Sequence, residues 1–136
     1  GVGDLLRSIE KEFYNSIREK INTNDLIHPQ QDMLNSIFEI IYENREVYAA
    51  LLGKNGNEDF LRSILTISSD KVLRQWGESG INPDDLEYVY NFYIQGCVGL
   101  VGHWASRNFK ETPQEIANLF ARLLNALING MTAADK

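Results

Sequence analysis

Few residues of this 136-residue chain have the types and spacing that catalysis or metal binding requires. Glu39 and Glu43 form an i, i+4 carboxylate pair, but no Glu-x-x-His motif accompanies them, as a diiron helical bundle would require. Cys97 is the single cysteine, and one cysteine supplies neither a disulfide nor the paired thiols of a zinc or redox motif. No glycine-rich phosphate loop and no Gly-x-Ser-x-Gly motif occurs. The sequence therefore predicts a protein that is not an enzyme and holds no metal or cofactor.

The remaining reactive side chains are better explained by packing than by chemistry. His103 has no second histidine or acid at metal-ligand spacing, which favours an interface role. His28 precedes Pro29 and is typical of a loop. For Cys97, a buried small residue is favoured over a thiol sensor.

The composition limits the class of partner. The formal net charge is −6 and the 13 basic residues are scattered, which argues against a surface for nucleic acid or anionic lipid. The longest weakly polar run, residues 92–105, is shorter than the ~20 residues that span a bilayer. We expect one domain over residues 1–136, in the reducing cytoplasm. The leading glycine and the missing initiator methionine suggest a tag remnant followed by a piece of a longer protein.

Apolar residues recur at helical spacing almost throughout the chain, and no segment alternates with the period of two that indicates a strand. Asn82-Pro83 and the capping box Thr112-Pro113-Gln114-Glu115 mark two helix starts. The predicted fold is all-α, an antiparallel bundle of about five to six helices. The helices are expected up to residues 22–24, from about residue 33, and over 44–53, 58–76, 83–108 and 113–130.

The stretch YIQGCVGLVGHW, residues 93–104, contains Gly96, Gly99 and Gly102, although each glycine costs a helix about 1 kcal/mol relative to alanine. This helix has two apolar stripes, and a core of this size needs only one of them. We therefore expect the glycine stripe to meet a second copy of the chain, with the glycines allowing close backbone approach. The alternative is that the glycines accommodate a helix of the same chain, or a kink.

The last predicted helix adds a leucine-rich face of its own. Helices from Asp84 to Arg107 and from Pro113 to Asn129, contributed by two chains, would make a four-helix interface in a homodimer. The predicted interface residues are Val89, Phe92, Gly96, Gly99, Leu100, His103, Leu119, Phe120, Leu123 and Leu127.

From about Phe38 onward, the chain resembles the C-terminal domain of TetR-type transcriptional regulators, particularly the branch similar to dihydroxyacetone-kinase regulators. The resembling segments are FEIIYENREVYAALLG, DFLRSI and YNFYIQGCVGLVGHWASRNFKETPQEIANLFARLL. The last is the most specific, because it joins an aromatic helix with small residues to a Thr-Pro-x-Glu cap and a leucine-rich helix. The first helix, DLLRSIEKEFYNSI, resembles the segment that follows the DNA-reading domain.

This resemblance implies a bacterial, dimerising, effector-sensing domain whose final two helices pair across a twofold axis. It also implies an N-terminal helix-turn-helix domain, which is absent from this chain, so that DNA binding belongs to the absent part. The effector is either a small molecule or a protein partner. The alternative function is a stand-alone helical module whose apolar stripe binds a different protein.

A sensing domain needs a cavity, and the second stripe of the glycine-rich helix offers aromatic walls with a few hydrogen-bond donors. The alternative is that these aromatic residues only form the core. The predicted pocket residues are Tyr42, Tyr48, Phe60, Trp76, Tyr90, Tyr93, Cys97 and Trp104.

Overall fold

The computed structural model describes residues 2–22, 29–52, 58–67 and 69–133, and seven helices lie in these ranges. In chain order they are α1 (Val2–Asn22), α2 (Pro29–Glu43), α3 (Arg45–Leu52), α4 (Glu58–Leu65), α5 (Ser69–Glu78), α6 (Pro83–Ser106) and α7 (Pro113–Ala133). The described residues contain no strand. The predicted all-α class is therefore confirmed.

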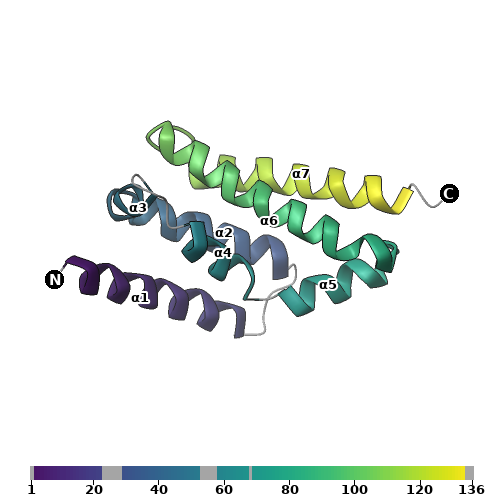
Figure 1. Cartoon of the computed structure of the whole chain (residues 1–136). Helices are drawn as coiled ribbons and strands as arrows, with labels where there is room; N and C mark the ends of the chain where they lie inside the picture. The colour runs from purple at the N-terminus through teal and green to yellow at the C-terminus, as the bar shows by residue number, and fades with distance from the viewer. Residues whose placement is uncertain (1, 23–28, 53–57, 68, 134–136) are drawn as a thin grey trace.

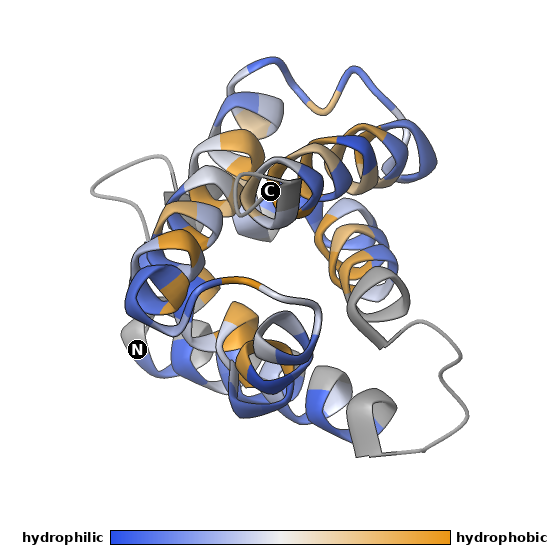
Figure 2. Ribbon diagram, turned by 90° about the vertical axis from the view of Figure 1, so that its right-hand side faces the viewer, coloured by the Kyte–Doolittle hydropathy of each residue, from blue (hydrophilic) through white to orange (hydrophobic). Residues whose placement is uncertain are grey.

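The helices are stacked so that α6 and α7 form one outer layer and α1 the other, with α2, α3 and α4 between them (Figure 1). Helix α2 packs against α7 and α1, whereas α3, α4 and α5 pack against α6. Seen along the bundle, the hydrophobic residues lie mainly on the sides of the helices that face one another (Figure 2). Helices α2 and α6 are thus the two elements against which the others pack.

The starts of α6 and α7 follow the predicted capping chemistry. The side-chain Oδ1 of Asn82 accepts a hydrogen bond of 2.9 Å from the backbone N–H of Asp84, which caps α6. At the start of α7, the backbone N–H of Glu115 donates to Thr112 Oγ1 at 3.1 Å, and the Thr112 N–H donates to Glu115 Oε1 at 3.2 Å. This reciprocal pair is the capping box that the sequence predicted.

Three predicted helix boundaries were wrong. Helix α2 begins at Pro29 and not at about residue 33, because proline is favoured at the first position of a helix. The single helix expected over residues 58–76 is two helices, because the backbone turns at Thr66 and Ile67, where the Ser69 N–H bonds to the Thr66 carbonyl. The hydrophobic period continues across this turn, so periodicity alone does not reveal it. Gly130 does not end α7, which continues to Ala133 and keeps Met131 packed against the core.

A tight turn connects α6 to α7. Asn108 and Phe109 both have positive φ, 56° and 54°, the left-handed conformation that non-glycine residues rarely adopt. The Phe109 N–H bonds to the Trp104 carbonyl at 3.0 Å, and the two rings pack edge to face with centroids 4.9 Å apart. The Trp104 Nε1–H donates to the Glu111 carbonyl at 2.9 Å. Trp104 therefore ties together both ends of the turn.

The core is built entirely from hydrophobic residues. No charged or polar residue is buried among those that the structure describes. The largest side chains with under 2% exposure include Trp76, Trp104, Tyr48 and Phe38. None of the described helices is both long enough and apolar enough to cross a membrane.

Candidate functional site

The glycine stripe of α6 lies open on the surface of the chain. Gly96, Gly99 and Gly102 are exposed, and a Cβ atom added at any of them would meet nothing within 4 Å. Helix α6 also passes through all three glycines without interruption. No described part of the same chain packs closely enough on the glycines to explain them.

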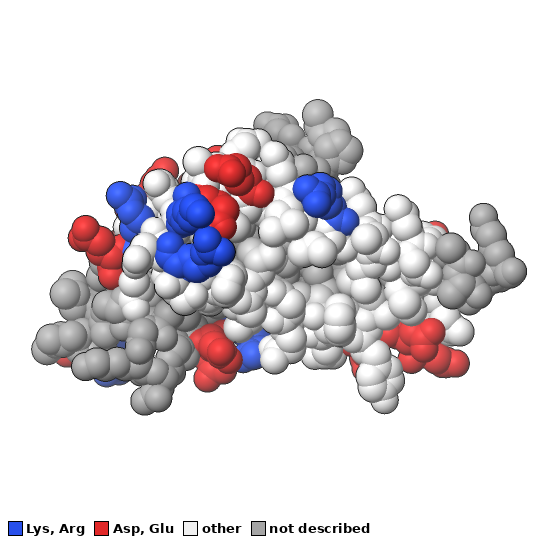
Figure 3. Space-filling view, turned by 90° about the horizontal axis from the view of Figure 1, so that it is seen from above, with Lys and Arg blue, Asp and Glu red and all other residues white. Residues whose placement is uncertain are grey.

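Large exposed hydrophobic side chains are concentrated on α6 and α7. In the described part of the chain these are Tyr88 and Phe92 on α6, with exposures of 81% and 72%, and Leu119 and Leu123 on α7, with exposures of 37% and 52%. From Tyr88 to Gly102, α6 carries no charged residue. Seen from above, a broad uncharged area extends over the centre and right of the molecule, while basic and acidic side chains gather mainly toward the left (Figure 3).

Most of the residues predicted for the dimer interface are accessible. Those exposed or partly exposed are Phe92, Gly96, Gly99, Leu100, His103, Leu119, Leu123 and Leu127. Val89 and Phe120 do not fit the predicted interface, because they are 7% and 4% exposed and belong to the core of the single chain. Tyr88 was missed, although its position four residues before Phe92 places it on the same side of the helix. The interface itself stays a prediction.

Five of the residues predicted for the pocket form two aromatic groups. Trp76 on α5 contacts Tyr90 and Tyr93 on α6, with ring centroids 5.9 and 5.3 Å apart, and the two tyrosine rings are 6.3 Å apart. We call these three residues the α5–α6 cluster. The side chain of Phe60, another predicted pocket residue, lies outside the described residues.

The second group is built around Trp104. Its ring is stacked on Tyr42 at 6.1 Å and contacts Phe38 edge to face at 6.0 Å. Because the indole N–H is already bonded to the Glu111 carbonyl, Trp104 has no free donor to offer a ligand. Phe120 connects the two groups, since its ring lies 6.0 Å from Tyr93 and 5.6 Å from Phe38. Tyr42 and Trp104 thus pack in a second aromatic group, and their part in a pocket stays a prediction.

The α5–α6 cluster has buried polar atoms that lack hydrogen bonds. Trp76 Nε1, Tyr90 Oη and Tyr93 Oη find no partner in the described structure, although each of these atoms is buried. Ser69 and Cys97 are close enough to affect the pKa values of Tyr90 and Tyr93 respectively, but neither meets the geometry of a well-formed hydrogen bond. More than nine in ten buried polar groups are normally paired, so three orphans in one cluster are unusual.

Tyr48 on α3 is a separate case. Its side-chain oxygen is also buried and unpaired, but its ring contacts none of the three cluster rings among the described aromatic pairs. The structure therefore does not bring Tyr48 together with the cluster.

Burial keeps the titratable groups of this region neutral. Desolvation raises the pKa of Tyr48, Tyr90 and Tyr93 above the ordinary value of 10.0. It likewise raises the pKa of the Cys97 thiol above its ordinary value of 9.0. A raised pKa lowers the thiolate fraction, which is the reactive form, so Cys97 has the character of a buried packing residue. No described group of three or more His, Cys, Asp or Glu residues could hold a metal ion.

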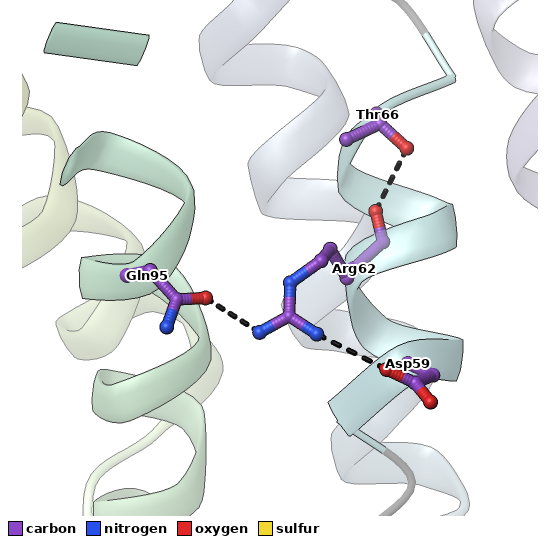
Figure 4. Close-up of polar contacts among 4 residues, drawn as sticks. All are labelled: Asp59, Arg62, Thr66 and Gln95. Atoms are coloured by element: carbon purple, nitrogen blue, oxygen red, sulfur yellow. Dashed lines mark hydrogen bonds and ion pairs between the residues drawn. The ribbon is translucent and has the colours of Figure 1, made fainter. Parts of the chain in front are cut away.

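One polar bridge connects α4 to the open side of α6. The Arg62 guanidinium donates to Gln95 Oε1 at 2.5 Å and to Asp59 Oδ1 at 3.2 Å, while the Arg62 carbonyl accepts from the Thr66 hydroxyl (Figure 4). Gln95 directly precedes Gly96 in the sequence. The bridge therefore holds α4 at the edge of the glycine stripe.

Comparison with known proteins gives a match to a protein family. Residues 30–126 match the family model TetR_C_8, described as a transcriptional regulator C-terminal region. No curated protein and no solved structure matches the chain. The matched range begins in α2 and ends in α7, so it includes both the open glycine stripe and the α5–α6 cluster.

Proposed function

This chain belongs to the TetR-type transcriptional regulator C-terminal family, and from that premise we propose that it is the part of a regulator that forms the dimer and senses an effector. The observation that carries the proposal is the open side of α6 and α7, where the large exposed hydrophobic residues of the described chain are gathered and where α6 carries no charge from Tyr88 to Gly102. DNA binding is assigned to a separate helix-turn-helix domain of the same protein, because the charge of this chain is −6.

The proposed dimer contact uses α6 and α7 of both subunits. Phe92, Leu119 and Leu123 would supply apolar area, since burying a Phe or Leu side chain fully contributes about 1.5 to 3 kcal/mol. Gly96 and Gly99 would allow the partner backbone to approach α6 closely. Two such pairs of helices around a twofold axis make a closed and self-complementary contact.

The dimer contact also explains how a sensing domain controls DNA binding. Two reading domains on one dimer must match the spacing of two half-sites on the DNA. An effector that favours one arrangement of the dimer therefore changes the affinity for the operator. Within this proposal the protein is a cytoplasmic regulator without catalytic activity, and its relation to the dihydroxyacetone-kinase regulator branch rests on the sequence resemblance alone.

Native mass spectrometry of wild type and Gly99→Leu tests the proposal. We expect wild type at twice the mass of the chain and the variant at the single mass. Within one chain, the new side chain enters open space and replaces a poor helix former, so helicity by circular dichroism should be kept or increased. Lys71→Leu adds a leucine at an exposed position of α5, outside α6 and α7, and serves as the control, which should stay dimeric.

The alternative of a stand-alone interaction module makes the opposite prediction. A module that binds a different protein would be a monomer by itself and would pair only after a second chain is added. A monomeric wild type, or a Gly99→Leu variant that is still dimeric, would contradict the dimer contact proposed here. In the second case the dimer would use another surface.

A further inference from the structure

The three residues that carry the unpaired polar atoms of the α5–α6 cluster pack against one another in the core. Trp76, Tyr90 and Tyr93 are 1%, 8% and 5% exposed, and their rings contact one another. A buried polar group without a hydrogen bond destabilises the folded state, and this cluster contains three. A bound molecule that supplies hydrogen-bond acceptors would remove that cost, which provides free energy for binding.

We infer that the α5–α6 cluster is the effector site and that it takes an uncharged, ring-containing molecule carrying a hydrogen-bond acceptor such as a carbonyl oxygen. The inference rests on the proposed sensing function and adds the chemical class of the effector. The bound molecule must carry the acceptor, because the indole N–H of Trp76 can donate a hydrogen bond and cannot accept one. The aromatic rings favour a planar or apolar body through stacking and edge contacts.

The charges around the cluster argue against an ionic effector. No charged residue is buried in the described core, so an ion there would lose its hydration without gaining a counter-charge. The Asp70 carboxylate is close enough to raise the pKa of Tyr90, which makes an anion still less favourable. A cation can be attracted by aromatic faces, but it supplies no acceptor for the Trp76 N–H.

Access to the cluster requires α5 to move. Helix α5 has ten residues, and its buried residues are Val72 and Trp76. A molecule that inserts beside Trp76 therefore shifts α5 relative to the long helix α6. The connection from α5 to α6 includes Gly80 at φ 102°, a backbone conformation that glycine adopts without strain.

The experiment uses four single-ring probes and the two tryptophan indole N–H signals in a ¹H–¹⁵N NMR spectrum. Acetophenone carries a neutral carbonyl acceptor, ethylbenzene lacks one, benzoate is an anion and phenyltrimethylammonium is a cation. We expect acetophenone to shift the Trp76 signal saturably and to bind about fivefold or more tightly than ethylbenzene, the factor that one net hydrogen bond contributes. The Trp104 signal, whose N–H is already bonded, is the internal control.

A double variant, Tyr90→Phe with Tyr93→Phe, keeps both rings and removes both hydroxyl groups. We expect it to weaken acetophenone binding at least about fivefold and to leave ethylbenzene binding unchanged. Tyr88→Phe, at an exposed position on the same helix, should change neither. Equal affinity for acetophenone and ethylbenzene, tighter binding of either ion, or no saturable shift of Trp76 with any probe would overturn the inference.

These outcomes are separate from the test of the proposed function. A chain that is dimeric by mass but whose Trp76 signal responds to no probe loses the effector class and keeps the dimer. A monomeric chain that binds acetophenone keeps the site and loses the dimer.

Discussion

Replacing Tyr93 by Phe should make the protein more stable, which is the reverse of the usual effect of a core substitution. The Tyr93 ring contacts Trp76 and Phe120, and phenylalanine preserves both contacts. The hydroxyl oxygen is buried without a hydrogen bond, and such a group costs about 1 to 3 kcal/mol. We expect Tyr93→Phe to raise the free energy of unfolding by about 1 kcal/mol, the lower end of that range, because the Cys97 thiol offers a weak contact.

Urea unfolding followed by circular dichroism measures this change. The midpoint should rise with an unchanged m-value, since the surface exposed on unfolding is the same. Tyr88→Phe, at a tyrosine that is 81% exposed, should change stability by less than about 0.5 kcal/mol. If Tyr93→Phe instead lost 1 kcal/mol or more, the hydroxyl would be bonded in solution, by a buried water or by Cys97, and would not be free for a ligand.

Two further predictions concern pH and the start of α7. Burial raises the pKa of Tyr93 and Cys97 above their ordinary values of 10.0 and 9.0, so the folded state holds these protons more tightly than the unfolded state does. The free energy of unfolding should therefore be at its full value below pH 9 and should fall as pH rises above it. The expected loss is about 1.4 kcal/mol per pH unit for each group that ionises only on unfolding. Urea midpoints measured between pH 8 and pH 11 test this, and a flat profile would contradict the burial of these groups. Thr112→Ala removes the acceptor for the Glu115 N–H and should cost about 1 kcal/mol by thermal unfolding, whereas Thr112→Ser should cost less, and equal losses would mean that the hydroxyl does not cap α7.

The sequence predicted the starts of α6 and α7 well, because the capping hydrogen bonds there join residues that are close in the chain. The Asn82 cap and the Thr112–Glu115 box each depend on residues within three positions, so their sequence patterns were sufficient. The break between α4 and α5 and the continuation of α7 past Gly130 depend on tertiary packing, for which the hydrophobic period gives no signal. Boundaries of this kind are where periodicity is least informative.

For the candidate sites too, the sequence predicted which residues share a side of a helix, but it did not predict their hydrogen-bond partners. Helical spacing placed Phe92, Gly96 and Gly99 on one side of α6, and these residues are indeed exposed together. The same reasoning could not separate Trp76 from Trp104, because both lie on apolar stripes and both are 1% exposed. They differ in one hydrogen bond, from Trp104 to the carbonyl of Glu111 seven residues away. Only three-dimensional coordinates reveal that one indole is paired and the other is not.

Helix α6 carries both proposed sites on opposite sides, and this arrangement accounts for the cost of its glycines. Three glycines give up about 3 kcal/mol of helix stability, and nothing described in the single chain packs against them. Tyr90 and Tyr93 are buried in the protein core, whereas Phe92 and Gly96 of the same helix are exposed. A molecule seated against the two tyrosines therefore acts on the element that would make the dimer contact, with no intermediate structure needed. Under the two proposals, effector binding and dimer geometry are coupled because one rigid helix takes part in both.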